Sequence, residues 1–273
     1  METKVVLLTG ASAGIGLAAA NLLMDAGATV YAASRRGGDN KKSSSGEGEI
    51  INIALDVNDE ISLKSAVENI IKQKGKLDAV ICNAGNGIAG AIEDISSEEV
   101  KYQFETNFFG AVKTIQACLP VFRSQGYGKV IAVSSVAGVI PIPFQTLYSA
   151  SKSALLTFMK ALSLEVKPFG IQCCTVLPGD TKTDFTAARK FAEKAQNSSS
   201  AYYKTMTASI ARMEKDEQNG RPAEFVAQKM VNQVYKNKMC FTVIPGIEYK
   251  IFNWLFKVLP TRLSVWIVGL LYA

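Results

Sequence analysis

Short apolar runs alternate with helical segments along the first two thirds of this 273-residue chain. Runs such as "KVVLLTG" and "GKVIAVSS" lack the strict polar alternation of a sheet that has one face in water. Strands of this kind, separated by helices, indicate a parallel sheet that is covered on both faces. The sequence therefore predicts an α/β fold, and a chain of this length can form it as one unit.

Six strands and four helical stretches are expected. The strands are placed at 4–10, 28–34, 51–57, 77–85, 128–135 and 171–179, and the helices at about 15–26, 62–74, 97–125 and 149–166. Residues 35–49, between the second and third strands, are rich in glycine, serine and charge. That composition predicts an exposed, mobile loop.

The first expected strand runs into "TGASAGIG", which contains Gly10, Gly14 and Gly16. In a parallel sheet, ligands bind beyond the carboxyl ends of the strands, where this turn lies. We expect Gly10 to allow a tight turn, Gly14 to let the backbone approach a pyrophosphate, and Gly16 to let the next helix pack against the sheet. The motif favours dinucleotide binding over a plain tight turn.

The end of the second expected strand bears on which dinucleotide binds. It reads Ser34, Arg35 and Arg36, where an NAD-binding chain would place an acid for the ribose 2′-hydroxyl. Arginine can bind a 2′-phosphate through paired hydrogen bonds, whereas an acid would repel it. The sequence favours NADP(H), and the alternative is that both arginines are merely solvated surface.

Six motifs occur along the chain: TGxxxGxG, "CNAG" at 82–85, "TN" at 106–107, "VSS" at 133–135, "YSASK" at 148–152 and "PG" at 178–179. In order and spacing they resemble the classical short-chain dehydrogenase/reductase family, over about residues 4–183. The resemblance implies a doubly wound Rossmann fold with the active site inside a single domain over residues 1–273. It also implies an enzyme that uses a nicotinamide cofactor.

The resemblance assigns four catalytic residues. Tyr148 would be the general acid or base, and Lys152, one helical turn further on, would hold the nicotinamide ribose and lower the pKa of Tyr148 toward working pH. Ser135 would polarise the substrate oxygen, with Ser134 expected to face the opposite way. Asn107 would support a water-mediated proton path to the lysine, and as a polar residue it can also stabilise a helix irregularity.

The resemblance also implies the cofactor site. Asp56 and Val57 would contact the adenine. A loop replaces the helix that usually follows the second strand in this family, and this leaves open how firmly Arg36 is held. The expected cofactor residues are Gly10, Ser12, Ala13, Gly14, Ile15, Gly16, Arg35, Arg36, Asp56, Val57, Asn83, Ala84, Gly85, Tyr148, Lys152, Pro178, Gly179, Thr181 and Thr183.

The chain contains no histidine, which excludes a Ser-His-Asp hydrolase and any zinc site that needs imidazole. Its five cysteines show no metal-ligand spacing, so we expect no metal and free thiols in a reducing compartment. The formal charge of +6 is spread along the chain, without the basic block that would indicate nucleic-acid binding. We expect a cytoplasmic protein.

A long insertion at about 184–222 is expected to form a substrate lid. Together with "GVIPIPF" at 138–144, its aromatic and methionine side chains suggest a large apolar pocket, although they could equally be the core of two lid helices. The expected substrate-binding residues are Ser135, Ile142, Gln145, Tyr148 and Phe185.

The tail at about 247–273 is unusually apolar but is interrupted by Lys257, Pro260 and Arg262, so it is not predicted to span a membrane. It could cap the pocket, form an oligomer contact in a homo-oligomer, or rest on a membrane surface as an amphipathic segment, in that order of preference.

These features predict an NADP(H)-dependent oxidoreductase that interconverts a ketone and a secondary alcohol. A bulky lipophilic substrate such as a hydroxysteroid is the first expectation. Reduction of acyl-chain ketones or small xenobiotic carbonyls is the enzymatic alternative. From another class of protein, an NADP-sensing binding protein would keep the fold without the chemistry.

Overall fold

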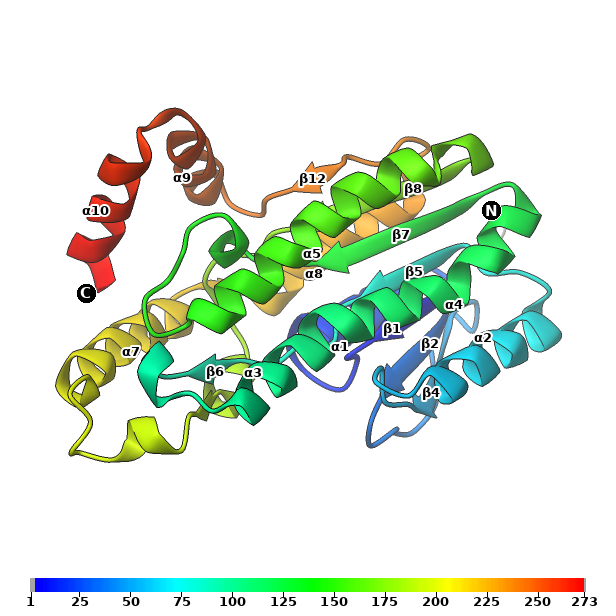
Figure 1. Ribbon diagram of the computed structural model, residues 1–273. Helices are drawn as coiled ribbons and strands as arrows, with labels where there is room; N and C mark the ends of the chain where they lie inside the picture. Colours follow the sequence, from blue (N-terminus) through cyan, green and yellow to red (C-terminus); the bar gives the residue numbers. More distant parts are fainter. Residues whose placement is uncertain (1–2, 273) are drawn as a thin grey trace.

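A computed structural model describes residues 3–272 (Figure 1). At its centre is an eight-stranded sheet in the order β12-β8-β7-β5-β1-β2-β4-β3, in which only the β3–β4 pair is antiparallel. The strand order runs outward from β1 in both directions, so a crevice forms at the carboxyl ends where the winding reverses. The expected doubly wound α/β fold is confirmed.

The strands of this sheet are β1 Val5–Thr9, β2 Thr29–Ser34, β3 Lys41–Lys42, β4 Glu49–Ala54, β5 Ala79–Cys82, β7 Gly128–Val133, β8 Ile171–Val176 and β12 Thr242–Val243. The helices that flank it are α1 Gly14–Asp25, α2 Glu60–Lys74, α3 Ser97–Phe104, α4 Gly110–Gln125, α5 Thr146–Glu165 and α8 Ala223–Tyr235.

Both faces of the sheet are buried, as the apolar strands predicted. On β1, Val5 and Leu7 point into a core made with α2, α4 and α5. Val6 and Leu8 point to the other face, into a core made with α1 and α8. Alternate residues of one strand thus reach two separate cores, which explains why the strand is apolar throughout.

The remaining elements gather at one end of the molecule, at the carboxyl ends of the strands (Figure 1). They are β6 Ile88–Ala89, β9 Thr181–Lys182, α6 Phe185–Ala188, β10 Lys190–Phe191, α7 Tyr203–Gln218, β11 Arg221–Pro222, α9 Ile247–Val258 and α10 Thr261–Tyr272. The last helix, α10, contacts both α9 and α7. Residues 1, 2 and 273, which end the predicted domain and tail, lie outside the described residues.

Several local predictions differ from the structure. The third strand is 49–54 rather than 51–57, and the loop 35–48 contains the short antiparallel strand β3. The single helix expected at 97–125 is two helices joined by a π-helical turn, Glu105–Phe109. Sequence patterns also missed α8 and β12, although α8 supplies much of one core.

None of the helices between residues 3 and 272 has the length and hydropathy that crossing a bilayer requires.

Candidate active site

The glycine-rich turn adopts the backbone shape that its sequence demands. Gly10 and Gly14 have φ angles of 66° and 53°, in the left-handed region that side chains disfavour. A Cβ on Gly16 would lie 2.1 Å from the carbonyl oxygen of Gly10. The helix α1 starts at Gly14 without a side-chain cap, so its first N–H groups remain free for an anion.

Asn83 braces this turn from the neighbouring strand. Its Nδ2 donates to the carbonyl of Gly10 at 2.9 Å, and Thr9 Oγ1 accepts from the backbone N–H groups of Asn83 and Ala84 at 3.1 and 3.2 Å. A Cβ on Gly10 would lie 2.7 Å from Ala84 Cα. The ends of β1 and β5 are therefore held at a spacing that only glycine allows.

A cavity of about 590 Å³ lies at the carboxyl ends of the strands. All the expected cofactor residues line it except Gly16, which packs beneath the turn, and Arg36. Arg36 lines a smaller adjacent pocket with Ser12 and Arg35. All five expected substrate residues also line the main cavity, so one space brings the cofactor and substrate predictions together.

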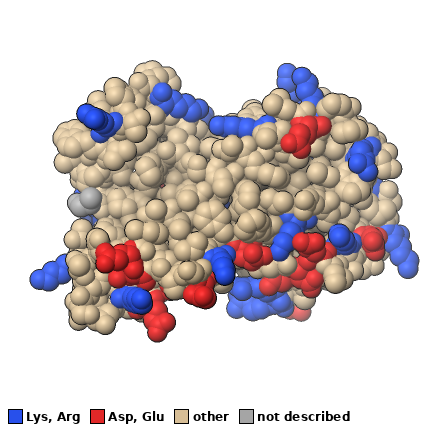
Figure 2. Space-filling view, in the orientation of Figure 1, with Lys and Arg blue, Asp and Glu red and all other residues tan. Residues whose placement is uncertain are grey.

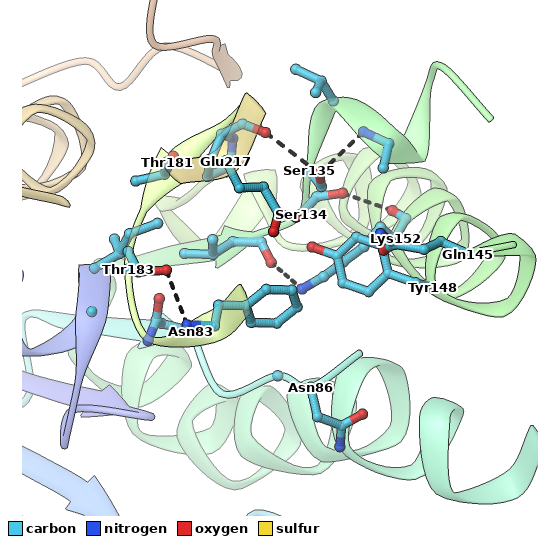
Figure 3. A pocket seen from close by; sticks show the side chains of 18 of the residues that line it. Asn83, Asn86, Ser134, Ser135, Gln145, Tyr148, Lys152, Thr181, Thr183 and Glu217 are labelled. Atoms are coloured by element: carbon cyan, nitrogen blue, oxygen red, sulfur yellow. Dashed lines mark hydrogen bonds between the residues drawn. The ribbon is translucent and has the colours of Figure 1, made fainter. Parts of the chain in front are cut away.

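Tyr148 and Lys152 lie on the same face of α5 and both reach the cavity (Figure 3). The Nζ of Lys152 is 5.7 Å from the centre of the Tyr148 ring and donates to the carbonyl of Val133 at 2.9 Å. The lysine side chain is buried, and its ammonium is held between the end of β7 and the tyrosine.

Burial shifts the pKa values of both members of this pair. Burial raises the pKa of Tyr148 to about 12, and a hydrogen bond with Ser135 opposes that effect only in part. Burial also lowers the pKa of Lys152 to about 8. Burial of the phenol therefore opposes the lowering of the Tyr148 pKa that is expected from Lys152, and that lowering stays a prediction.

The two serines of "VSS" face different ways, as expected from their adjacent positions. Ser134 Oγ donates to the carbonyl of Lys152 at 2.7 Å and so ties β7 to α5. Ser135 Oγ accepts from the N–H of Ala137 at 3.1 Å and donates to the carbonyl of Pro178 at 3.4 Å, and its hydroxyl lowers the pKa of the neighbouring Tyr148. Ser135 is therefore the serine that shares the tyrosine's part of the cavity (Figure 3).

Asn107 is buried in the π-helical turn, outside the cavity lining. Its Nδ2 donates to the carbonyl of Asn86 at 2.9 Å and to Ser151 Oγ at 3.2 Å, and its Oδ1 accepts from the N–H of Asn86 at 2.8 Å. A Cβ on Gly85 would lie 3.3 Å from Asn107 Oδ1 and 3.4 Å from Lys152 Nζ. Asn107 therefore holds the loop beside the lysine. Asn86, which directly follows "CNAG", was not predicted.

The lid insertion divides between the cavity and its own core. Phe185 lies with its ring centre 5.7 Å from that of Tyr148, and Met213 also lines the cavity. Met206 is instead buried in a separate apolar cluster, and Phe191 is exposed. Gln145 is buried against Met213, with its Nε2 3.3 Å from the sulfur. Some lid side chains thus line the apolar pocket, and others form a core of the lid itself.

The tail contributes side chains to the lining of the cavity. Tyr249 Oη donates to Asp180 Oδ2 at 2.8 Å and accepts from the N–H of Asp180 at 2.9 Å. The ring of Tyr249 covers Gly179 so closely that a Cβ there would lie 2.2 Å from it. The tail residues that line the cavity are Glu248, Tyr249, Phe252, Phe256, Ile267, Val268, Leu271 and Tyr272.

Sequence reasoning also missed acidic side chains of the cavity, among them Asp180 and Glu217. Glu217 accepts from Thr186 Oγ1 at 2.6 Å and pairs with Arg189, whose side chain is fully buried. Burial raises the pKa of Asp180, and the nearby Asp216 and Glu217 raise it further. Asp180 directly follows the "PG" motif, which is the only local signal for it, whereas Glu217 has none.

Fold and site together define a dinucleotide-binding Rossmann protein in which a half-buried tyrosine and a buried lysine face the cleft. The short chain dehydrogenase family model matches residues 4–194, and the chain belongs to this family of oxidoreductases, which act on CH–OH and C=O groups. It is 42% identical over 221 residues to a 3-ketodihydrosphingosine reductase of Bacteroides thetaiotaomicron, covering 81% of this chain and 79% of that protein. It is 33% identical over 198 residues to human 17-beta-hydroxysteroid dehydrogenase type 1, covering 68% and 59%.

Solved structures agree on the fold. A short-chain dehydrogenase from Streptomyces avermitilis matches with a TM-score of 0.80 and 27% identity, covering 97% of this chain and 96% of that one. A Burkholderia phymatum family member in complex with NAD matches with a TM-score of 0.77 and 19% identity, covering 93% and 92%. A Burkholderia cenocepacia dehydrogenase in complex with NADP matches with a TM-score of 0.71 and 21% identity, covering 97% of each chain.

Proposed function

We propose that the protein is an NADP(H)-dependent oxidoreductase that interconverts a ketone and a secondary alcohol on a bulky lipophilic substrate. One observation carries the proposal. A single cavity joins the glycine-rich turn to Ser135, Tyr148 and Lys152, and then to an apolar end formed by the lid and the tail. Within this proposal, residues 184–222 act as the substrate lid and residues 247–272 close the cavity.

The choice of NADP(H) rests on the end of β2. Arg35 and Arg36 are exposed there and share a pocket with the hydroxyl of Ser12, and neither position carries an acid. Two guanidinium groups and a hydroxyl suit a 2′-phosphate. The related structures with NAD and with NADP support a nicotinamide cofactor of either kind. The proposal of NADP(H) therefore rests on the two arginines.

In the reduction direction, Tyr148 would act as the proton donor. With a pKa of about 12, its phenol is protonated at neutral pH and can give a proton to the carbonyl oxygen. Ser135 would hydrogen-bond the same oxygen and stabilise the charge that develops on it. The nicotinamide supplies the hydride when the cofactor is bound. Lys152 would stabilise the phenolate left behind, and Asn107 would keep the loop beside Lys152 in place.

The apolar end supports a large substrate. Phe252, Phe256 and Val268 of the tail line it, together with Phe185 and Met213 of the lid. A long-chain ketone is the first substrate class to test. The relative named a 3-ketodihydrosphingosine reductase is 42% identical to this chain, whereas the relative named a hydroxysteroid dehydrogenase is 33% identical. A steroid ketone is the second. Small xenobiotic carbonyls would leave most of this surface without a contact.

The proposal is tested by following NADPH absorbance with a panel of long-chain, steroid and small ketones. Turnover should appear with at least one lipophilic ketone, and Tyr148→Phe should lower kcat by about 10²–10⁴-fold while NADPH binding, measured by fluorescence, stays unchanged. Turnover that survives the substitution would exclude Tyr148 as the acid. A flat trace across the panel, with NADPH still bound, would favour the NADP-sensing alternative.

The cofactor preference is tested by Arg35→Asp. The change replaces attraction with repulsion at the 2′-phosphate, so the Kd for NADPH should rise by about 100-fold while the Kd for NADH changes little. Lys64→Asp, at an exposed position on α2 outside both pockets, is the matched control for the charge change. Equal weakening of both cofactors would contradict the assignment.

A further inference from the structure

The outer side of α9 and α10 exposes a continuous set of apolar side chains. On α9 they recur at positions 247, 251, 254 and 258, the spacing of one face of a helix. Each member of the set is more than half exposed, and together they form what we call the α9–α10 apolar face: Ile247, Ile251, Trp254, Val258, Val265, Trp266 and Leu270. A folded protein rarely leaves a patch of this kind uncovered in water.

The charges around this face are of one sign. Lys250, Lys257 and Arg262 are exposed on the same two helices, and none forms an ion pair with another residue between 3 and 272. The only acid of the helix pair, Glu248, pairs with Arg221 at 3.1 Å. Figure 2 shows this lobe, at the upper left, as tan and blue without red. The face is therefore apolar and rimmed by cations.

That charge pattern distinguishes between two possible occupants. In a two-fold dimer through this face, each cation would meet the same cationic rim, with no acid to pair with it. An anionic lipid surface complements both the cations and the apolar residues. Trp254 and Trp266 add side chains that favour the membrane–water interface. We propose that the α9–α10 apolar face docks on an anionic membrane surface.

The same two helices connect that surface to the cavity. Their inner side chains line the cavity, and two of them, Phe252 and Leu271, are also 42% and 37% exposed. An apolar ligand would therefore meet no polar barrier at these side chains between the lipid and the cavity. If the proposed function holds, a lipophilic ketone would enter between α9 and α10 directly from the bilayer.

The two tryptophans provide the test, because they are the only ones in the chain and both lie on this face. The full-length protein is mixed with phosphatidylcholine vesicles, with and without phosphatidylglycerol. We expect the tryptophan emission to shift to shorter wavelength, and the protein to float with the vesicles that contain phosphatidylglycerol. Raising the salt concentration should weaken this binding. Neither readout needs substrate or turnover, so a failure here is separate from a failure of the proposed activity.

Two sets of variants identify the surface. Lys250→Glu, Lys257→Glu and Arg262→Glu combined should weaken binding to the anionic vesicles by at least about 100-fold, since each basic residue near such a surface contributes severalfold. The control variant carries the same charge change at three exposed lysines on the flanking helices, Lys64, Lys72 and Lys160. It should bind the anionic vesicles more tightly than the first variant does. Ile251→Asp should weaken binding to both kinds of vesicle.

Three outcomes would overturn the proposal. One is an emission spectrum that anionic vesicles leave unchanged. Another is equal loss of binding in the two charge-reversal sets, which would indicate attraction by net charge alone. The third is that the original protein binds no vesicles and forms a dimer in solution, which Ile251→Asp converts to monomer. That result would assign the face to a second copy of the chain. Thermal melts of each variant exclude misfolding as the cause.

Discussion

Alanine in place of Gly179 should loosen the tail from the active site. A Cβ at this position would lie 2.2 Å from the Tyr249 ring, whereas ordinary van der Waals contact begins at 3.4 Å. The ring must therefore retreat by about 1.2 Å, the difference between these two distances. The hydrogen bonds of Tyr249 to Asp180, at 2.8 and 2.9 Å, would stretch with it.

The size of the effect follows from these contacts. Overpacking of this kind costs about 1–3 kcal/mol. At about 2 kcal/mol, the melting temperature should fall by roughly 4–8 °C. Urea denaturation measures the cost, and limited trypsin digestion should cleave faster at Lys250 and Lys257 on α9. The KM for a lipophilic ketone should rise, because the tail forms part of the cavity.

A matched glycine and a double variant make the reasoning refutable. Gly269 lies in α10 with no atom within 4 Å of an added Cβ, so Gly269→Ala should stabilise the protein by about 0.4–1 kcal/mol. In a Tyr249→Ala background the cost of Gly179→Ala should almost vanish, because the clashing ring is gone. The argument is refuted if Gly179→Ala is as stable as the original protein, or if its cost is the same in both backgrounds.

Three further predictions concern the glycine turn, Tyr148 and Lys152. Gly16→Ala would place a Cβ 2.1 Å from the carbonyl oxygen of Gly10. Calorimetry should therefore show a larger loss of stability than for Gly179→Ala, and titration should show loss of NADPH binding. An affinity for NADPH equal to that of the original protein would contradict the packing argument. Alcohol oxidation requires the Tyr148 phenolate. Because burial raises the pKa of Tyr148, only a small fraction is phenolate at neutral pH, and kcat/KM for oxidation should rise by up to about tenfold per pH unit above neutrality. Ketone reduction should weaken above about pH 8 as Lys152, with a pKa of about 8, loses its charge; flat profiles in both directions would exclude these roles.

The sequence by itself determined the fold class and most of the site. Strand, turn and helix are set by residues close together in the chain, so the alternation of apolar runs and the "TGASAGIG" turn were sufficient. The pair Tyr148 and Lys152 needs only four residues of helix to share a face. Because parallel strands end at one edge of the sheet, motifs far apart in the chain were also expected to meet there.

Only the tertiary structure decided which tail residues line the cavity and how far the tyrosine is removed from solvent. Tyr249 covers Gly179 although 69 residues separate Tyr249 from its hydrogen-bond partner Asp180, and no local pattern specifies such a contact. Burial raises the pKa of Tyr148, although the side chain also lines the cavity. Desolvation sums over every segment packed around a group, so it can oppose a neighbouring charge that the sequence shows plainly.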